Sequence, residues 1–307
     1  MIITVTETGS FMRCRRRWDY SSRNRQGLEP VINAPALTLG SLMHLVLEKW
    51  TLGEIPDDDL DTFYMTAAAD KVAEIISDYK RRIGVKPNMD ELGDVYEAIE
   101  IGRSMVANYK AYYKTPLPKG YKTIQPEQTC LVPIPGTDGG FLEGTLDSLV
   151  QNSKGVLFVL ERKTYKQRPR KDRLARNHQF LAYYWILRQL FPDRTIGGIL
   201  YDGMWKKVAP GKKQTLDDLF FRNLFTRAEE EVEEFSANIV DIYNDMANDP
   251  KIYPYIPWQG CWDCRFDKLC EAQSLGEDVE YVRETYYKQR EPDSRFEMED
   301  RHDDNSE

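Results

Sequence analysis

The chain has 307 residues, of which 41% are hydrophobic and 30% are charged, and its formal net charge is -8. This length and hydrophobic content can bury a large core, as one elaborated domain or two closely merged ones. The sequence contains no apolar run long enough to span a bilayer, and its N-terminus lacks the basic start and apolar block of a signal peptide. We therefore expect a cytoplasmic protein (in the host cytoplasm if it is virally encoded) with no membrane partner.

The negative charge is concentrated at the C-terminus. Residues 291–307 hold eight acids and two arginines, so this segment contributes -6 and the rest of the chain only -2. The overall acidity therefore does not exclude a nucleic-acid partner. Because the segment has few apolar residues, we predict that 291–307 is a disordered acidic tail.

The first basic cluster lies near the N-terminus. After a short strand or loop, we predict a helix across residues 11–20, with Thr8, Gly9 or Ser10 as its N-cap. Trp18 and Tyr20 are interleaved with basic side chains here, a mixture that suits contact with a nucleic-acid backbone. A solvated helix face would explain the same pattern. The four arginines of this cluster are Arg13, Arg15, Arg16 and Arg17.

Three helices are predicted before the first long strand. Residues 38–52 form an amphipathic pattern that ends at Gly53, and His44 lies beside its apolar stripe. A lone histidine in such a place is more often structural than a ligand. Residues 58–83 and 91–114 predict two further helices, which form a helical insertion at about 54–116. A strand is predicted to follow at 128–134.

A predicted hairpin carries charged groups where a core is expected. Residues 141–150 and 156–160 form strands around turn residues 151–155. Glu161 and Lys163 stand at the end of the second, wholly apolar strand, on one face of its pleat, and Asp147 can lie level with Glu161. Two carboxylates and a lysine suit a divalent-metal and proton-transfer site. Ordinary strand-end charges facing solvent are the alternative.

The most basic stretch of the sequence follows this hairpin, at residues 164–176. We predict a helix at 172–190, on which Gln179 and Tyr183 share a face, whereas His178 points elsewhere and has a structural role. A strand at 195–205 and a long helix at 216–246 complete the pattern, and the acidic run at 229–234 is read as a solvated face.

Cysteines are clustered near the C-terminus. Cys261, Cys264 and Cys270 form a C-x2-C-x5-C arrangement, and with Cys14 they make four thiols, leaving only Cys130 inside a strand. Clustered thiols in a cytosolic protein favour metal over disulfides. An iron–sulfur cluster and a zinc site both fit this spacing.

These motifs together resemble the PD-(D/E)XK nuclease superfamily. The resemblance rests on Gly144-x-x-Asp147, then Glu161-x-Lys163, then Gln179 and Tyr183. The upstream Gly40-Ser-Leu-Met-His44, with one cysteine before the core and three after it, is similar to the RecB-like and CRISPR-associated exonuclease branch. No proline precedes Asp147, as is common in that branch, and the second carboxylate is Glu rather than Asp.

The resemblance implies a restriction-endonuclease-like α/β core with a mixed central sheet flanked by helices. It implies a single nuclease domain at 1–290, with the core at about 127–205 and a C-terminal helix and cluster segment at about 216–275. A structural [4Fe–4S] cluster on Cys14, Cys261, Cys264 and Cys270 would clamp the termini together.

The resemblance also implies roles for individual residues. Mg²⁺ or Mn²⁺ would be held by His44, Asp147, Glu161 and the backbone carbonyl of Arg162. Lys163 would orient or deprotonate the attacking water, and Gln179 and Tyr183 would position substrate or the lysine. The basic residues implied to contact the DNA backbone, besides the four N-terminal arginines, are Lys166, Arg168, Arg170, Lys171, Arg173 and Arg176.

The expected function is therefore that of a Mg²⁺- or Mn²⁺-dependent deoxyribonuclease, an exonuclease on single-stranded DNA or DNA ends. Two alternatives stay open. One is a non-catalytic iron–sulfur protein that binds DNA. The other is a nuclease that works only as a subunit, with partner proteins in recombination or CRISPR adaptation.

Overall fold

The fold is described from a computed structural model that covers residues 1–32, 35–254, 261 and 264–290. The predicted acidic tail at 291–307 lies outside these residues. The chain divides into two compact units, each built from an N-terminal and a C-terminal segment. Unit 1 comprises Met1–Arg13 and Ile32–Lys251, and unit 2 comprises Cys14–Val31 and Ile252–Glu307.

Unit 1 contains two mixed sheets. The larger has the strand order β3-β6-β7-β8-β9, in which β7 and β8 are parallel and the other pairs antiparallel. The smaller has the order β1-β5-β4, with β1 parallel to β5. The strands are β1 (Ile2–Thr4), β3 (Tyr121–Gln125), β4 (Gln128–Pro133), β5 (Phe141–Leu146), β6 (Leu149–Asn152), β7 (Leu157–Tyr165), β8 (Ile196–Trp205) and β9 (Phe220–Phe225).

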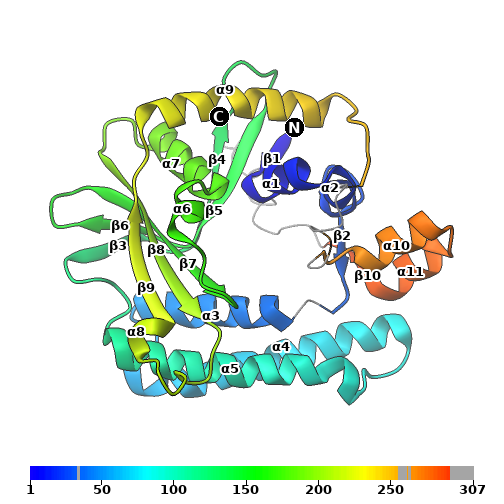
Figure 1. The fold of residues 1–307 in the computed structure, drawn as a ribbon, viewed down its shortest axis with the longest axis horizontal. Coiled ribbons are helices and arrows are strands. Elements are labelled where there is room, and N and C mark those ends of the chain that lie inside the picture. Colours follow the sequence, from blue (N-terminus) through cyan, green and yellow to red (C-terminus); the bar gives the residue numbers. More distant parts are fainter. Residues whose placement is uncertain (33–34, 255–260, 262–263, 291–307) are drawn as a thin grey trace, which may run out of the picture. The chain divides into compact units, whose positions relative to one another are not determined.

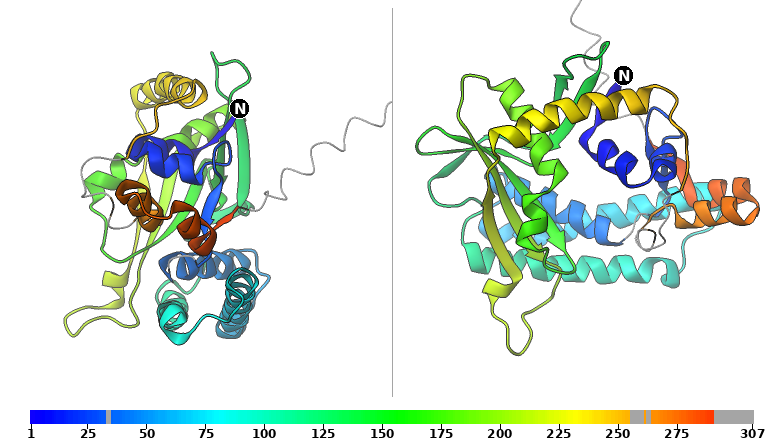
Figure 2. Two further views of the ribbon diagram at one scale, coloured as in Figure 1. Left: turned by 90° about the vertical axis from the view of Figure 1, so that its right-hand side faces the viewer. Right: turned by 45° about the horizontal axis from the view of Figure 1, so that its top comes forward.

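Helices pack on both sides of these strands, which confirms the predicted α/β class with mixed sheets (Figure 1). Helix α7 contacts β4, β5, β8 and α9, whereas α3 contacts β7 and packs with α4 and α5. The left view of Figure 2 shows these three helices nearly end-on, as a bundle. The helical elements of unit 1 are α1 (Val5–Arg13), α3 (Pro35–Thr51), η1 (Asp57–Asp59), α4 (Leu60–Ile83), α5 (Met89–Tyr113), α6 (Lys171–Ala175), α7 (His178–Leu190), α8 (Leu216–Leu219) and α9 (Glu229–Ala247).

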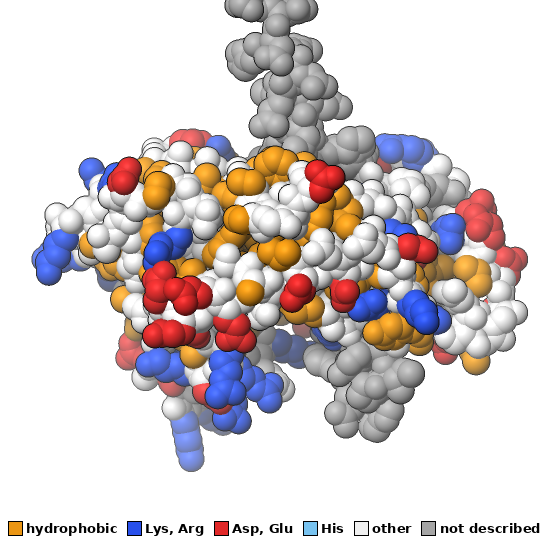
Figure 3. Space-filling view, turned by 90° about the horizontal axis from the view of Figure 1, so that it is seen from above, with side chains coloured by type: hydrophobic (Ala, Val, Ile, Leu, Met, Phe, Trp, Pro, Cys, Tyr) orange, Lys and Arg blue, Asp and Glu red, His pale blue; other side chains and the backbone are white. Residues whose placement is uncertain are grey.

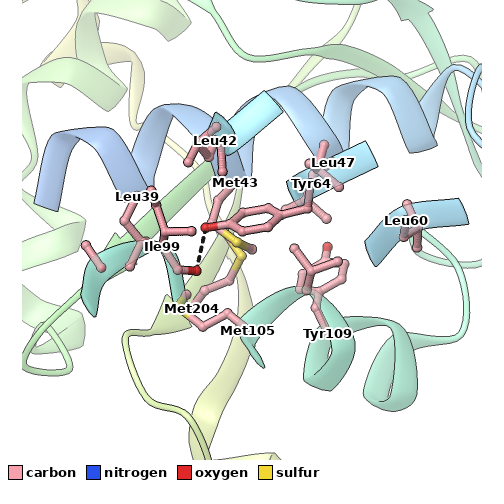
Figure 4. Packing of buried hydrophobic residues seen from close by; sticks show 14 of the residues in the cluster. Leu39, Leu42, Met43, Leu47, Leu60, Tyr64, Ile99, Met105, Tyr109 and Met204 are labelled. Atoms are coloured by element: carbon pink, nitrogen blue, oxygen red, sulfur yellow. Dashed lines mark hydrogen bonds between the residues drawn. The ribbon is translucent and has the colours of Figure 1, made fainter. Parts of the chain in front are cut away.

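The helical bundle has an apolar core that also receives Met204 from β8 (Figure 4). Tyr64 lies at its centre and donates a hydrogen bond to the carbonyl of Ile99 at 3.0 Å, so its buried hydroxyl is satisfied. A Cβ at Gly102 would collide with this tyrosine, and glycine therefore allows α4 and α5 to approach closely here. The helices predicted at 58–83 and 91–114 are confirmed as α4 and α5.

Unit 2 joins an N-terminal and a C-terminal segment of the chain through β2 and β10, which pair antiparallel. Its small core includes Tyr20, Phe266 and Tyr287, and the rings of Phe266 and Tyr287 stack with centroids 5.4 Å apart. The elements of this unit are α2 (Arg15–Ser21), β2 (Leu28–Pro30), α10 (Asp267–Leu275), α11 (Val279–Tyr286) and β10 (Tyr287–Gln289).

The predicted N-terminal helix at 11–20 is wrong in its limits. Helix α1 already begins at Val5, because Thr4 and Glu7 cap it reciprocally through hydrogen bonds of 2.9 and 3.0 Å. Cys14 then interrupts the helix with extended backbone, and its Sγ accepts a hydrogen bond from the N–H of Arg17 at 3.4 Å. The cysteine therefore acts as the N-cap of α2.

The predicted strand at 141–150 is broken at Asp147 and Ser148, because β5 belongs to the smaller sheet and β6 to the larger. The second hairpin strand is longer than predicted and continues through Tyr165. Glu161 and Lys163 consequently lie inside the ladder with β8 and not at its end.

Two predicted helices are also corrected. The helix at 172–190 is divided into α6 and α7, since the Asn177 side chain caps α7 by accepting from the N–H of Gln179 at 2.8 Å. The helix at 216–246 is wrong: a strand, β9, separates α8 from α9. The apolar positions of Phe220–Phe225 also fit helical spacing, but pairing with the edge of β8 satisfies their backbone groups. Within the described ranges, no helix is long and apolar enough to cross a membrane.

Candidate active site

Asp147 lies where the chain passes from the smaller sheet to the larger one. The pairing of Leu149 with Val159, extended by two residues, brings Asp147 opposite Glu161. The N–H of Arg162 donates a hydrogen bond of 2.7 Å to Asp147 Oδ2, and the N–H of Leu160 donates one of 2.8 Å to the carbonyl of Ser148. The backbone of β7 therefore fixes this carboxylate, as the hairpin prediction required.

Glu161 and Lys163 share one face of β7, as predicted. Glu161 is fully buried; its Oε1 lies 2.6 Å from Lys163 Nζ, and its Oε2 has no hydrogen-bond donor among the described residues. Burial raises the pKa of Glu161 to about 7, and the Asp147 carboxylate acts in the same direction. The pKa of Lys163 is also raised, because the two carboxylates outweigh the effect of its burial.

His44 reaches this group from α3. Its Nδ1 lies 3.4 Å from Asp147 Oδ1. Burial by itself would lower the pKa of His44, but the Asp147 carboxylate outweighs it and the pKa is raised. Conversely, the pKa of Asp147 is lowered, because His44 and Lys163 together outweigh its burial. The structure thus brings His44, Asp147, Glu161 and Lys163 into mutual electrostatic contact.

Gln179 and Tyr183 lie on α7 against the strand that leads to Asp147. Gln179 Nε2 donates to the Tyr183 hydroxyl at 2.7 Å, and this hydroxyl donates to the carbonyl of Thr145 at 2.6 Å. A Cβ at Gly144 would lie 3.2 Å from the Tyr183 ring and 2.7 Å from Ile186, so glycine lets α7 approach β5 this closely. The pair therefore holds the backbone two residues before Asp147.

The donor set of this group suits a hard divalent cation. It offers two carboxylates and an imidazole, and one oxygen of the buried Glu161 has no hydrogen-bond donor among the described residues. In the part of the chain that the structure describes, no three His, Cys, Asp or Glu side chains are placed closely enough to enclose a metal ion as they stand. His44, Asp147 and Glu161 therefore offer ligand atoms of the type that such an ion binds, and they lie near one another.

A buried row of charges on β7, β8 and β9 was not anticipated from the sequence. Arg162, Asp202 and Arg222 are adjacent in the strand pairing, and Asp202 is fully buried. Asp202 Oδ2 lies 3.0 Å from an Arg222 nitrogen and accepts a hydrogen bond of 2.5 Å from Tyr109 on α5. Arg162 donates to Thr51 Oγ1 on α3 at 2.8 Å. An aspartate inside an otherwise apolar strand is the sequence signal that could have revealed this row.

The four cysteines predicted to bind a cluster all belong to unit 2 and are partly buried. Burial raises the pKa of Cys264, and Cys14 and Cys261 are close enough to add to this effect. Cys270 Sγ accepts a hydrogen bond from Arg16 at 3.5 Å. Cys130 is separate: it is buried in unit 1, where burial raises its pKa to about 11.

The predicted DNA-contacting residues fall into two groups. The N-terminal arginines are partly buried: Arg15 lies over the Tyr253 ring at 5.4 Å, and Arg16 donates to Ser274 at 3.1 Å as well as to Cys270. The contacts of Arg15 and Arg16 are thus internal to unit 2. The second group is exposed throughout and consists of Lys166, Arg168, Arg170, Lys171, Arg173 and Arg176.

Comparison with protein families identifies the class of protein. The model of the PD-(D/E)XK nuclease superfamily matches residues 3–271. The chain belongs to this superfamily, and membership implies a metal-dependent nuclease that acts on DNA. No curated protein sequence matches the chain. A solved structure described as the crystal structure of SSO0001 is 16% identical, covers 88% of this chain and 86% of that chain, and superimposes with a TM-score of 0.36.

Proposed function

We propose that this protein is a Mg²⁺- or Mn²⁺-dependent deoxyribonuclease that hydrolyses phosphodiester bonds as an exonuclease, on single-stranded DNA or DNA ends. The observation that carries the proposal is the convergence of His44, Asp147, Glu161 and Lys163 at β7 in a chain of a nuclease superfamily. Together these side chains supply ligands for a divalent ion and a positive charge next to it, which the hydrolysis of a phosphodiester requires.

His44, Asp147, Glu161 and the backbone carbonyl of Arg162 would hold the ion. When bound, the divalent ion lowers the pKa of a water ligand and polarises the phosphate. Lys163, which keeps its proton because of the neighbouring carboxylates, orients the attacking water and stabilises the negative charge that grows on the phosphate. Gln179 and Tyr183 position the strand that precedes Asp147.

We further propose that the protein belongs to the RecB-like and CRISPR-associated exonuclease branch and carries a structural [4Fe–4S] cluster. Four partly buried thiols in one unit support this assignment, since they come from both ends of the described chain. Cys14, Cys261, Cys264 and Cys270 would be the ligands. A nuclease subunit of a recombination or CRISPR adaptation complex would use the same residues.

An assay on linear and covalently closed circular single-stranded DNA tests the proposal. With Mn²⁺ or Mg²⁺, the purified protein should degrade the end-labelled linear strand and leave the circle intact, and EDTA should stop the reaction. Equal loss of the circle would show an endonuclease. A protein that cuts neither DNA with either metal would refute the catalytic proposal and favour the non-catalytic DNA-binding protein.

A further inference from the structure

A lysine-rich loop joins β8 to β9 and was not among the predicted DNA-contacting segments. Residues 206–214 contain four lysines and no acid. Lys212 and Lys213 are exposed, whereas Lys207 stacks on the Trp205 ring at 3.8 Å and donates to Gln214 at 3.1 Å. The two acids that follow, on α8, already interact: Asp218 accepts from the N–H of Thr215, and Asp217 from Tyr112. The loop therefore carries a local excess of positive charge.

The strand topology places this loop beside the basic stretch 166–176. Strands β7 and β8 are parallel, and Tyr165 pairs with Trp205 at their carboxyl ends. Both basic segments therefore begin at the same ends of these strands. Two hydrogen bonds of 2.9 Å connect them: the N–H of Lys206 donates to the carbonyl of Tyr165, and Trp205 Nε1 donates to the carbonyl of Lys166. In open α/β sheets, ligands bind outside the carboxyl ends of the strands.

The candidate active site lies near the same ends of the strands, since Lys163 is two residues before the end of β7. The opposite side of unit 1 is different in charge. Helix α9 lies there, away from the β8–β9 loop (Figure 1), and its first turns carry exposed glutamates at 229–231, 233 and 234. Glu229 and Glu231 form ion pairs with Arg188 and Arg227, and the other three glutamates add negative charge to this side. Figure 3 looks onto the α9 side and shows acidic side chains gathered on one part of its surface, with basic side chains beside them. A polyanion would thus be attracted to the loop side of the unit.

We propose that the lysine loop 206–213 and the stretch 166–176 are the two sides of one contact surface for the phosphate backbone of single-stranded DNA. The surface lies next to the candidate active site and guides the strand to it without reading sequence. This inference rests on the proposed function, because it assumes that DNA is the substrate.

The test compares two triple variants of the full chain that change the same charge. One, Lys207→Gln/Lys212→Gln/Lys213→Gln, alters the loop. The matched control, Lys119→Gln/Lys122→Gln/Lys154→Gln, alters exposed lysines near the β6–β7 turn, at the amino end of β7. Anisotropy of a fluorescein-labelled oligothymidylate of about 20 nucleotides, in EDTA and over a series of salt concentrations, gives the affinity and its salt slope.

The loop variant should bind at least about tenfold more weakly than the wild type at roughly 100 mM salt, and the magnitude of its salt slope should fall by roughly 2, since each phosphate contact on a single strand contributes about 0.7. The control should keep the slope. If the triple variant does not fold, the double variant Lys212→Gln/Lys213→Gln, limited to exposed side chains, should lower the magnitude of the slope by about 1.4, which is roughly two thirds of the same effect.

Equal losses in both triple variants would overturn the proposal, because net charge alone would then explain them. Unchanged affinity in the loop variants would overturn it as well. A wild-type protein that binds no DNA would refute the proposed function itself, which is a distinguishable result.

Discussion

Glu161 is fully buried and lies beside a second carboxylate, that of Asp147, and beside Lys163. Burial of carboxylates lowers the stability of the fold unless positive charge compensates them. The Lys163 side chain, by contrast, is 41% exposed, and the pKa values of Asp147, Glu161 and Lys163 are shifted by their interactions with one another. The two carboxylates of this arrangement are ones that a protonated lysine and a divalent cation would compensate together.

The first prediction concerns these charges. Glu161→Gln and Lys163→Met should each lower the initial rate on end-labelled single-stranded DNA by about 10²–10³ or more. The first variant removes a charge proposed to hold the divalent ion, and the second removes the positive charge proposed to stabilise the phosphate, while the side-chain volume is kept. Thermal unfolding should show that both variants are folded. The matched control is Glu143→Gln on β5, where another buried glutamate lies outside the candidate site. Normal activity in a well-folded Glu161→Gln protein would remove Glu161 from the site.

His178 illustrates a structural role that can be tested by pH. Its Nε2 lies 3.0 Å from Thr8 Oγ1, its ring lies 5.5 Å from that of Phe235, and burial lowers its pKa. The folded state therefore binds fewer protons at this residue than the unfolded chain, whose histidine pKa is about 6.5. Its contribution to stability is present above that pH and is lost as the pH falls through about 6.5 toward the folded pKa.

The second prediction follows from this linkage. Relative to His178→Gln, whose amide can still bond Thr8, the wild-type protein should be favoured most at about pH 8 and progressively less between about pH 7 and pH 5. Urea unfolding at each pH gives the difference in free energy, and other titrating groups cancel in the comparison. A difference that does not change with pH would show that the imidazole titrates alike in both states.

At the scale of elements, the sequence predicts best where periodicity and burial agree. The stripe around His44 correctly indicated α3, because its spacing fits only the helical period. The apolar run Val156–Leu160 correctly indicated β7, because it is short and follows turn residues. The segment around Phe220–Phe225 fits two periods, and the open edge of β8 decided the outcome, which no local pattern contains. Likewise, the break at Asp147 follows from a change of sheet and not from a turn residue.

The buried row on β7, β8 and β9 connects the sheet to the helical bundle. Thr51 on α3 and Tyr109 on α5 contact Arg162 and Asp202, respectively. Because α3 also carries His44, the row contributes to the placement of this histidine relative to β7. Removing one charge from such a row leaves the others buried without compensation, which is far more costly than removing a complete pair.

The third prediction is therefore that Asp202→Asn lowers the free energy of unfolding by about 3–5 kcal/mol. The double variant Asp202→Leu/Arg222→Met should lose clearly less than the sum of its single variants, since it removes both charges. Urea unfolding of the wild type, the two single variants and the double variant measures this cycle. A loss below about 1 kcal/mol for Asp202→Asn would show that water or relaxation compensates Arg222.

At the scale of the whole molecule, the cysteine pattern predicted that two distant segments of the chain meet, and the pairing of β2 with β10 brings two such segments together. Unit 2 joins the segment at Cys14 to the segment at Cys261–Cys270, and its buried apolar core includes only five residues among those described. A core of this size adds little stability. The sequence showed the thiols but could not show that β2 and β10 also pair, since strands of three residues have no detectable period.

The last prediction tests whether thiols complete this small core. Protein purified without oxygen should be brown and contain about four irons per chain, as four thiolates in a [4Fe–4S] cluster require. Replacement of Cys14, Cys261, Cys264 or Cys270 by serine should bleach the visible absorbance and lower the temperature of unfolding, whereas Cys130→Ser, in unit 1, should leave the absorbance unchanged. The unfolding of unit 2 should be affected more than the rate of DNA hydrolysis per folded molecule, because the residues proposed for hydrolysis belong to unit 1.

Zinc in place of iron would keep the four ligands and replace the cofactor. A colourless protein without either metal, whose unfolding temperature is unchanged by Cys14→Ser, would show that the core of unit 2 is sufficient without a metal.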